Sequence, residues 1–431
     1  MNSSRLFKLH GVVQHYDWGG FDFIPKLLGQ SHPSGKPCAE LWMGSHANGP
    51  ALVQNDEYLI PLPDLIASAP KEILGESVAA RFEDRLPYLF KVLDARKMLS
   101  IQAHPTLGQA AAGFEAEETA GVPITAPTRN YKDRNHKPEV HVALTDFWML
   151  HGFRPLEEIA DTLETVVELR PLMPNFRERL LTTGSDPALR AMLLRGLYER
   201  IMTMRQDEVD QLLNPLLRRL KKQPTRDKDF PDFWAARAAR EFPLPEGHRD
   251  RGIFSIYLLN LVRLKPGEAT YQSAGTLHAY LEGVNVELMA NSDNVLRGGL
   301  TPKNIDVPEL LRVLNFSDGK AEIIRGKNAS AVETIFPTPA AEFELSRLQL
   351  VDKQSFHSGI RNGPDILIVL NGAVMARCEN DSLQLNSGEI MLAPQSTSYA
   401  LETTGKSALM FKASLPSSSQ ISKPTINQAT P

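Results

Sequence analysis

A block with helical periodicity interrupts a chain that is otherwise patterned as β-strand. From the N-terminus to about Phe153, short apolar runs such as LFKVL and HVALTDFWML alternate with Gly and Pro, which predicts strands joined by irregular loops. From about Leu156 to Lys222 the apolar spacing becomes helical, and strand-like runs return near Ile253. The chain is therefore expected to be mainly β with an α-helical insert.

The clearest helix signal is the segment DPALRAMLLRGLYERI. Asp186 is a candidate N-cap, because its carboxylate can accept hydrogen bonds from the free N–H groups of the first turn, where Pro187 is also favoured. Four apolar residues recur at every fourth position, which predicts one face of the helix. They are Leu189, Leu193, Leu197 and Ile201.

The C-terminal part again reads as strands. In DILIVLNGAVMARCE, Asn371 and Gly372 separate two apolar runs and predict a β-hairpin, because both residues tolerate the positive φ of a type I′ turn. The last stretch, SLPSSSQISKPTINQATP, is polar and rich in Ser and Pro. It has too little apolar surface to bury, so residues 415–431 are expected to form a flexible tail.

A weak internal repeat links two parts of the chain. KPGEATYQSAGTLHAYLEG begins at Lys265 and NSGEIMLAPQSTSYALETT begins at Asn386, and both open with Gly-Glu after a short polar pair. Counted from each Gly, His278 in the first segment falls where Tyr399 sits in the second. We interpret the repeat, which rests on a handful of positions, as two related β-barrel units of which only the first keeps a metal-capable histidine.

Composition argues against several functional classes. The 431 residues carry a formal net charge of −4, whereas a nucleic-acid binder normally carries a basic stripe. No apolar run approaches the length of about 18 residues needed to span a membrane, and the N-terminus lacks a secretory signal pattern. Cys38 and Cys378 form no Cys-x-x-Cys pair. These features predict a reduced, cytoplasmic protein that binds neither nucleic acid nor membrane.

Two pairs of polar residues lie within strand-like runs. Gln102 and His104 in LSIQAHP are two positions apart, as are Glu139 and His141 in HKPEVHVAL, so each pair shares one face of a strand. His278 in GTLHAY is a further histidine. Imidazole and carboxylate are common zinc ligands, and a glutamine oxygen is a weaker neutral one. Any one of these histidines alone would more often be an ordinary polar residue at a strand end, but the combination indicates a metal site.

Five long segments resemble the type I mannose-6-phosphate isomerases. They are VQHYDWGG, AELWMGSHANGP, LPYLFKVLDARKMLSIQAHP, RNYKDRNHKPEVHVALTDF and GTLHAYLEGVNVELMANSDNVLRGGLTPKNIDV, and they occur in the family's order over about the first 310 residues. The remaining C-terminal third is similar only in general character.

The resemblance implies a fold and a cofactor. It implies a cupin-type (jelly-roll) β-barrel catalytic domain, an inserted helical domain and a second, metal-free cupin-like barrel. The expected boundaries are 1–155 with 252–320 for the catalytic domain, 156–251 for the insert and 321–414 for the C-terminal barrel. One Zn²⁺ per chain is implied, and the ligand positions fall on Gln102, His104, Glu139 and His278.

The implied reaction interconverts mannose 6-phosphate and fructose 6-phosphate by moving a proton between C2 and C1 through an enediolate. The family's active-site arginine falls on Arg297, a permanent cation suited to stabilising negative charge. Lys303 is a candidate phosphate contact, and Lys91, a lysine in an apolar run, needs a partner such as Glu40. Trp18 and Tyr280 are candidate sugar-facing groups.

The proton-transfer group is left open among four candidates. They are His136, Lys137, Glu287 and Asp293. A group that titrates near the working pH is the best acid–base catalyst, so the His136-Lys137 pair is preferred. Glu287 and Asp293 are alternatives that position hydroxyl groups or assist ring opening.

The sequence departs from the family pattern in three places, and other functions stay open. His141 replaces an aliphatic residue, Leu277 replaces an expected proline, and the segment 94–97 is expected to lie in a loop. The alternatives are another cupin metalloenzyme, such as an iron oxygenase, and a non-catalytic sugar- or metal-binding protein. The expected partner is a small sugar phosphate, and the expected state is a monomer.

Overall fold

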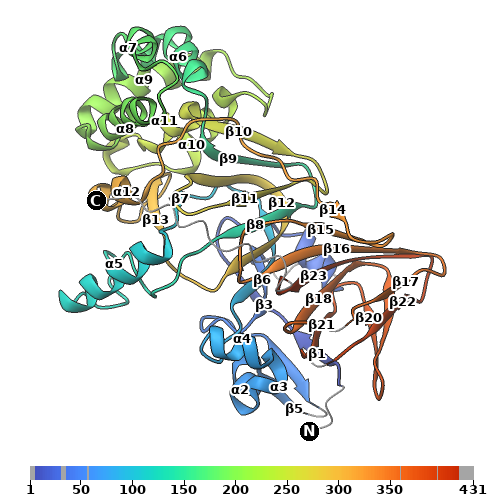
Figure 1. Ribbon diagram of the computed structural model, residues 1–431. Helices are drawn as coiled ribbons and strands as arrows, with labels where there is room; N and C mark the ends of the chain where they lie inside the picture. The colour runs from blue at the N-terminus through green and yellow to red at the C-terminus, as the bar shows by residue number, and fades with distance from the viewer. Residues whose placement is uncertain (1–4, 31–34, 56–57, 360, 396, 417–431) are drawn as a thin grey trace.

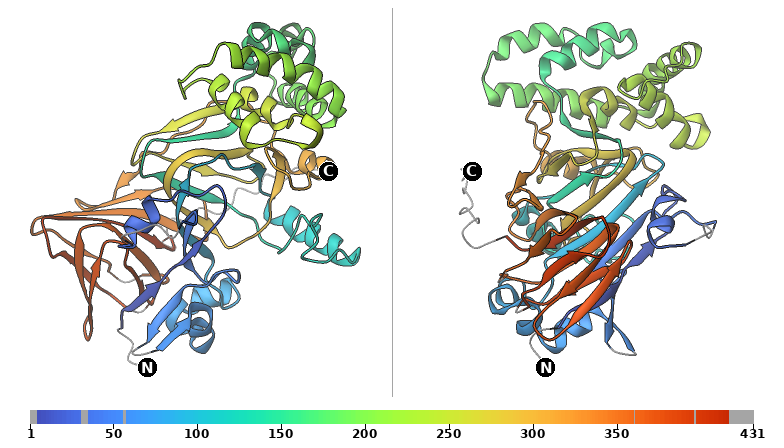
Figure 2. Two further views of the ribbon diagram at one scale, coloured as in Figure 1. Left: turned by 180° about the vertical axis from the view of Figure 1, so that it is seen from behind. Right: turned by 90° about the vertical axis from the view of Figure 1, so that its right-hand side faces the viewer.

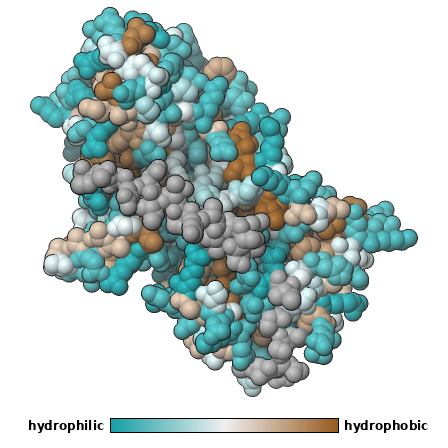
Figure 3. All heavy atoms as spheres, in the orientation of Figure 1, coloured by the Kyte–Doolittle hydropathy of each residue, from teal (hydrophilic) through white to brown (hydrophobic). Residues whose placement is uncertain are grey.

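The computed structural model describes residues 5–30, 35–55, 58–359, 361–395 and 397–416. The helices of residues 156–258 gather at one end of the molecule, a large sheet occupies the middle, and further sheets with a few short helices form the other end (Figures 1 and 2). On the face drawn in Figure 3, hydrophilic residues predominate and apolar residues form small separate groups. The expectation of a mainly β chain with inserted helices is confirmed.

The middle sheet has ten strands in the described part of the chain. They are β2 (Val12–Gln14), β3 (Glu40–Gly44), β6 (Tyr88–Ala95), β7 (Ile101–Ala103), β8 (Glu139–Ala143), β9 (Phe147–Phe153), β10 (Leu259–Leu264), β11 (Ala269–Gln272), β12 (His278–Ala290) and β13 (Leu296–Gly299). Strand β12 is its centre, because it pairs antiparallel with β6, β7, β8 and β9.

Two further sheets pack together beside it. The nine-stranded sheet runs in the order β14 (Lys327–Asn328), β15 (Glu333–Phe336), β16 (Glu344–Val351), β23 (Ser407–Ser414), β18 (Asp365–Asn371), β21 (Ile390–Ala393), β1 (Phe7–His10), β4 (Leu52–Asn55) and β5 (Tyr58–Pro61). The four-stranded sheet runs in the order β17 (Ser355–His357), β22 (Ala400–Thr403), β19 (Ala373–Arg377) and β20 (Ser382–Asn386).

Half of the α-helices of the described residues fall between β9 and β10. They are α6 (Leu156–Thr165), α7 (Phe176–Thr183), α8 (Pro187–Thr203), α9 (Gln206–Lys222), α10 (Pro231–Glu241) and α11 (Gly252–Leu258), with 3₁₀ turns at Val167–Leu172 and Pro245–Gly247. The others are α1 (Phe23–Leu27), α2 (Leu62–Ser68), α3 (Pro70–Leu74), α4 (Glu76–Arg81), α5 (Leu107–Thr119) and α12 (Val307–Val313). No helix of the described residues has the length and apolarity needed to cross a membrane.

Alternation along the strands gives the middle sheet two different faces. Val92, Val140 and Val286 belong to the core shared with the nine-stranded sheet. The intervening residues of the same strands, including Lys91 and Glu139, are buried on the opposite face. One face therefore supplies the apolar core and leaves the other for polar chemistry.

The start of helix α8 is confirmed, and its expected buried face is confirmed in part, because Leu197 and Ile201 are buried. The Asp186 carboxylate accepts hydrogen bonds from the N–H groups of Ala188 and Leu189, with Pro187 at the first helical position. Leu189, however, is 44% exposed. A spacing of four residues advances about 40° beyond a full turn at each step, so a run of such steps leaves the core. Besides Leu197 and Ile201, the buried face carries Leu194, Tyr198 and Met202.

The predicted hairpin at Asn371-Gly372 is wrong. Strand β18 pairs with β21 and β23, whereas β19 pairs with β20 and β22, so the chain passes from one sheet to another at this point. Gly372 has φ +82°, and a Cβ there would lie 2.2 Å from the carbonyl oxygen of Ser407. The dipeptide provides a corner between sheets, which the local pattern cannot distinguish from a hairpin turn.

The structure also bears on three smaller expectations: the loop at 94–97, the internal repeat and the C-terminal tail. Of the segment 94–97, Asp94 and Ala95 are the last two residues of strand β6 and Arg96 and Lys97 follow it in a bend, so the expected loop is present only in part. Gly267 and Gly388 form matching turns, with φ +89° and +85°. Of the predicted tail, Leu415 is buried with 7% exposure, and residues 417–431 lie outside the described residues.

Gly372→Ala is expected to lower the free energy of unfolding by about 2–4 kcal/mol, because it adds positive-φ strain and a clash with backbone. Urea denaturation measures the change. Gly405→Ala is the matched control, because its Cβ meets no atom within 4 Å and it lies in the same part of the chain. Equal stability of the two variants would contradict the corner geometry.

Candidate functional site

Strand register brings Gln102, His278 and Arg297 into one row. Gln102 of β7 lies directly opposite His278 of β12 on one side and Arg297 of β13 on the other. Residues directly opposite each other in antiparallel strands point to the same face, with Cβ atoms about 5 Å apart. The predicted amide ligand, a predicted histidine ligand and the predicted arginine are therefore neighbours.

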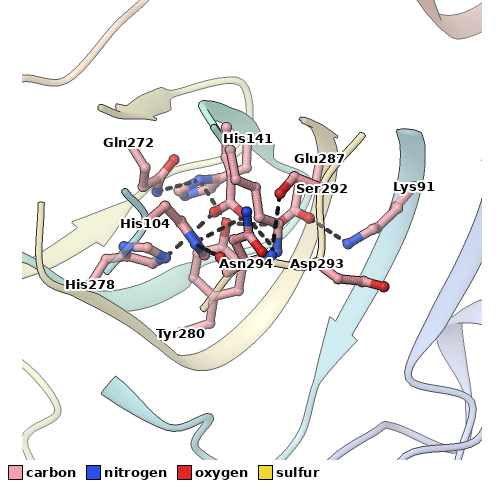
Figure 4. Close-up of polar contacts among 12 residues, drawn as sticks. Lys91, His104, His141, Gln272, His278, Tyr280, Glu287, Ser292, Asp293 and Asn294 are labelled. Carbon is pink, nitrogen blue, oxygen red and sulfur yellow. Dashed lines mark hydrogen bonds and ion pairs between the residues drawn. The ribbon is translucent and has the colours of Figure 1, made fainter. Parts of the chain in front are cut away.

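His104, Glu139 and His278 form a buried cluster at this row (Figure 4 labels the two histidines). His104 Nε2 lies 3.4 Å from Glu139 Oε1, and His278 Nε2 lies 3.5 Å from Glu139 Oε2. One potential ligand atom from each residue lies within 4.8 Å of the other two. Each residue is at most 4% exposed. Among the described residues, this is the group of His, Cys, Asp and Glu side chains with metal-binding geometry.

The histidine tautomers fit a cation at this cluster. His104 Nδ1 contacts the carbonyl oxygen of Asn294 at 2.7 Å, and His278 Nδ1 contacts that of Thr276 at 3.0 Å. A carbonyl can only accept, so each Nδ1 carries the proton and each neutral ring presents a lone pair at Nε2. His104 Nε2 has no hydrogen-bond partner within the described residues. Two lone pairs and a carboxylate thus converge, which is the donor set of a divalent metal.

Glu139 is held ionised. Burial would raise its pKa, but the positive charge of the Lys137 ammonium, with Nζ 3.2 Å from Oε1, opposes this effect, and the pKa lies well below its usual value. Burial also lowers the pKa of His104, which favours the neutral ring. The cluster therefore offers one negative and two neutral donors.

A second polar cluster lies next to the first on strands β6 and β12. Lys91 Nζ lies 2.9 Å from Glu287 Oε1 and 3.8 Å from Glu40 Oε1. Burial lowers the pKa of Lys91, but the two carboxylates outweigh it and raise the pKa above its usual value. Tyr280 donates a hydrogen bond to Glu287 Oε2 at 2.7 Å. Lys91 does have Glu40 beside it as expected, but Glu287 is the closer partner.

His141 lies beside both clusters without joining the metal-capable group. It is opposite Thr270 on β11 and Glu287 on β12. Its ring contacts Gln272 Nε2 at 3.0 Å and Thr270 Oγ1 at 3.3 Å. Burial lowers its pKa to about 3, so the ring is neutral. These contacts involve both ring nitrogens of His141.

Asp293 lies within electrostatic range of Lys137, whereas His136 contacts a residue of another part of the chain. Asp293 Oδ1 lies 3.3 Å from His46 Nε2, and its Oδ2 accepts a hydrogen bond from Asn48 at 3.2 Å. His136 precedes strand β8 and contacts Glu342 at 2.8 Å, away from the cluster. The structure therefore separates the predicted His136-Lys137 pair, because neighbouring residues of an extended chain point in opposite directions.

Two cations, Arg297 and Lys132, lie within electrostatic range of Lys303. Burial lowers the pKa of Lys303, and the positive charges of Arg297 and Lys132 lower it further. Both cations are therefore close enough to act on Lys303 electrostatically. None of the three side chains has a hydrogen bond or ion pair among the described residues. Lys132 was not predicted, although it stands in the motif RNYKDRN. Such a group fits a phosphate.

Trp18 is partly buried against the core around Leu93, and its ring stacks on Tyr16 with centroids 5.7 Å apart. Burial and the charge of Glu40 raise the pKa of Tyr16, so this 41% exposed phenol lies within range of the second cluster. Tyr16 and His46 were missed by the sequence analysis, although both stand in quoted motifs. Leu277 is buried, and the turn to His278 forms without the expected proline.

Comparisons with known proteins agree with this geometry. Residues 6–156 match the family model "Phosphomannose isomerase type I, catalytic domain". The mannose-6-phosphate isomerase of Escherichia coli is 40% identical over 89% of this chain and 93% of its own, and that of mouse is 34% identical over 96% and 99%. These similarities favour the isomerase over the two alternatives, an oxygenase and a non-catalytic binding protein.

Solved structures extend the similarity to the fold. A zinc-bound mannose 6-phosphate isomerase covers 95% of this chain and 99% of its own at 35% identity, with a TM-score of 0.82. The Salmonella typhimurium enzyme, bound to fructose 6-phosphate and zinc, gives the same values. The expected cupin fold class is confirmed. The chain belongs to the family of type I mannose-6-phosphate isomerases.

Proposed function

We propose that this chain interconverts D-mannose 6-phosphate and D-fructose 6-phosphate with one zinc ion. The proposed ligands are Gln102, His104, Glu139 and His278. The observation that carries the proposal is that the lone pairs of His104 and His278 and the carboxylate of Glu139 point to one buried position. Gln102 and Arg297 lie in the same strand row as His278. Bound zinc would act as a Lewis acid toward substrate oxygens or orient a water near them.

The chain's own residues have separable roles in this proposal. Arg297 stabilises the negative charge that develops on O1 and O2, and Lys303 with Lys132 binds the phosphate. Anchoring the phosphate positions the reacting carbons, because binding energy at the remote end restricts the sugar. Trp18 and Tyr280 contact the sugar.

Lys137 is the proposed proton carrier, acting at Nζ between C2 and C1. It is the member of the predicted pair that lies beside the cluster, 3.2 Å from Glu139. Glu287, fixed by Lys91 and Tyr280, and Asp293, fixed by His46 and Asn48, hold hydroxyl groups or assist ring opening. Glu40 supports Lys91.

The proposed domain organisation follows the sequence boundaries. Residues 1–155 and 252–320 form the catalytic cupin domain, 156–251 the helical insert and 321–414 a metal-free cupin-like domain. The monomeric state and the cytoplasmic location stay predictions.

Chelation is expected to abolish isomerase activity, and zinc to restore it. A coupled assay supplied with mannose 6-phosphate detects fructose 6-phosphate before chelation, after it and after zinc addition. Activity that is indifferent to chelation would contradict the zinc site, and absence of activity from the zinc-loaded chain would contradict the reaction.

His278→Ala is expected to lose zinc, because it removes one of the converging lone pairs. Metal analysis of the purified variant measures the loss. His141→Ala is the matched comparison and is expected to retain zinc, since His141 contacts Gln272 and Thr270. The reverse pattern would assign His141 as the ligand.

Arg297→Ala is expected to lower kcat by about 100-fold or more, since it removes a cation from the developing charge, while zinc content stays unchanged. Steady-state kinetics and metal analysis test this. Arg325→Ala, at an exposed arginine paired with Glu268, serves as control. Turnover near that of the control would remove Arg297 from the mechanism.

A further inference from the structure

A buried carboxylate of the helical end binds the backbone of the segment that joins Arg297 to Lys303. Asp250 is 3% exposed. Its Oδ1 accepts hydrogen bonds from the N–H groups of Gly252 at 2.7 Å and Leu300 at 2.9 Å, and its Oδ2 accepts one from Thr301 at 3.1 Å. A carboxylate with three backbone donors is a strong local anchor.

The segment that Asp250 binds has an unusual backbone. Strand β13 bulges between Arg297 and Gly299, as its register with β7 shifts there. Gly299 has φ +132° and Leu300 has φ +51°, a conformation that a leucine adopts only when its surroundings impose it. Two of the three donors to Asp250 follow directly on this bend. The carboxylate therefore compensates the cost of the bend at the place where it occurs.

The two backbones touch without intervening side chains. A Cβ on Gly252 would lie 2.6 Å from the Leu300 nitrogen, and one on Gly299 would lie 2.4 Å from the Gly252 Cα. Contact this close transmits a displacement of either segment directly to the other.

Asp250 itself is held by the helices. Its neighbour Arg249 donates its backbone N–H to Asp210 on α9 at 2.8 Å, and the Arg249 carbonyl accepts a hydrogen bond from Gln206 at 2.9 Å. Arg251 contacts the carbonyl oxygens at the end of α8. A rigid connection thus runs from α8 and α9 to the segment that carries the two cations.

We propose that Asp250 is a positioning residue that sets the placement of Arg297 and Lys303 for the substrate phosphate and the reacting oxygens. It acts through the backbone of residues 298–301 and touches no substrate. This gives the helical insert a role in catalysis, and it rests on the proposed isomerase function.

Asp250→Asn distinguishes a positioning role from a purely electrostatic one, because the two roles predict opposite changes in the affinity for an anion. Loss of a buried negative charge near Arg297 and Lys303 would by itself strengthen the binding of an anion. Loss of the anchor weakens it, because an amide nitrogen placed toward an N–H group cannot accept its hydrogen bond. We expect KM for mannose 6-phosphate and the inhibition constant of inorganic phosphate to rise about 10-fold, with zinc content unchanged.

Asp318→Asn is the matched control. Asp318 also joins the helical end to the rest of the chain, through the N–H of Leu156 at 2.9 Å and through Arg190, but it does not contact residues 297–303. It is expected to lower the melting temperature while leaving both constants unchanged. A general loss of stability would affect the two variants alike.

Folded Asp250→Asn with both constants within twofold of wild type, or with tighter phosphate binding, would overturn the proposal. If that variant does not fold, Gly252→Ala decides by the same measurements, since its added methyl displaces the segment at Leu300. If the wild-type chain does not isomerise mannose 6-phosphate, the proposed function fails. Calorimetric titration of the wild type and of Asp250→Asn with inorganic phosphate then still tests whether Asp250 strengthens phosphate binding.

Discussion

The site depends on an electrostatic conflict around Glu139. A buried, ionised carboxylate faces two imidazole nitrogens, and both of these present lone pairs because backbone carbonyls hold the protons at the opposite nitrogens. Such a group of acceptors is repulsive unless a cation lies between them. The Lys137 ammonium reaches one carboxylate oxygen, and His104 Nε2 has no hydrogen-bond partner among the described residues. The carbonyls of Asn294 and Thr276 thus support metal binding by fixing the tautomer of each histidine.

Strand β12 joins this conflict to the substrate side of the site. Its first half pairs with β7 and β9 and presents His278 and Tyr280, and its second half pairs with β6 and β8 and presents Glu287. Strict alternation would place Tyr280 and Glu287 on opposite faces, yet the two are hydrogen-bonded. The register shift after Tyr280 and the bend at Gly283, with φ +129°, exchange the faces between them. A single strand can therefore supply both clusters.

The sequence could predict features that depend on local periodicity, such as strands and helix caps. It could not predict features that depend on which distant strands pair. Glu139 and His141 lie on one strand as expected, and Asp186 is the expected N-cap, whereas Gln102 lies on β7 and His104 directly follows that strand. The family resemblance supplied the combination of residues across strands, which no local pattern contains. The role of Asn371-Gly372 depended on which strands pair, and the orientation of His136 depended on Glu342, more than 200 residues away. Tyr16 and Lys132 were missed because their importance comes only from groups that folding places near them.

The internal repeat shows why one of two similar turns binds a metal. In both copies the Glu side chain accepts the N–H three residues earlier, at 3.0 Å for Glu268 and 2.7 Å for Glu389. Where the first copy has His278 beside Glu139, the second has Tyr399, whose hydroxyl donates to the buried Asp365 at 2.8 Å. Arg361 lies 3.4 Å from the same carboxylate, so the chain supplies both the donor and the positive charge. A buried carboxylate with a hydroxyl donor and a positive charge beside it has less need of an external cation. The kind of neighbour therefore distinguishes the two carboxylates: histidine lone pairs surround Glu139, whereas a hydroxyl and a guanidinium lie beside Asp365.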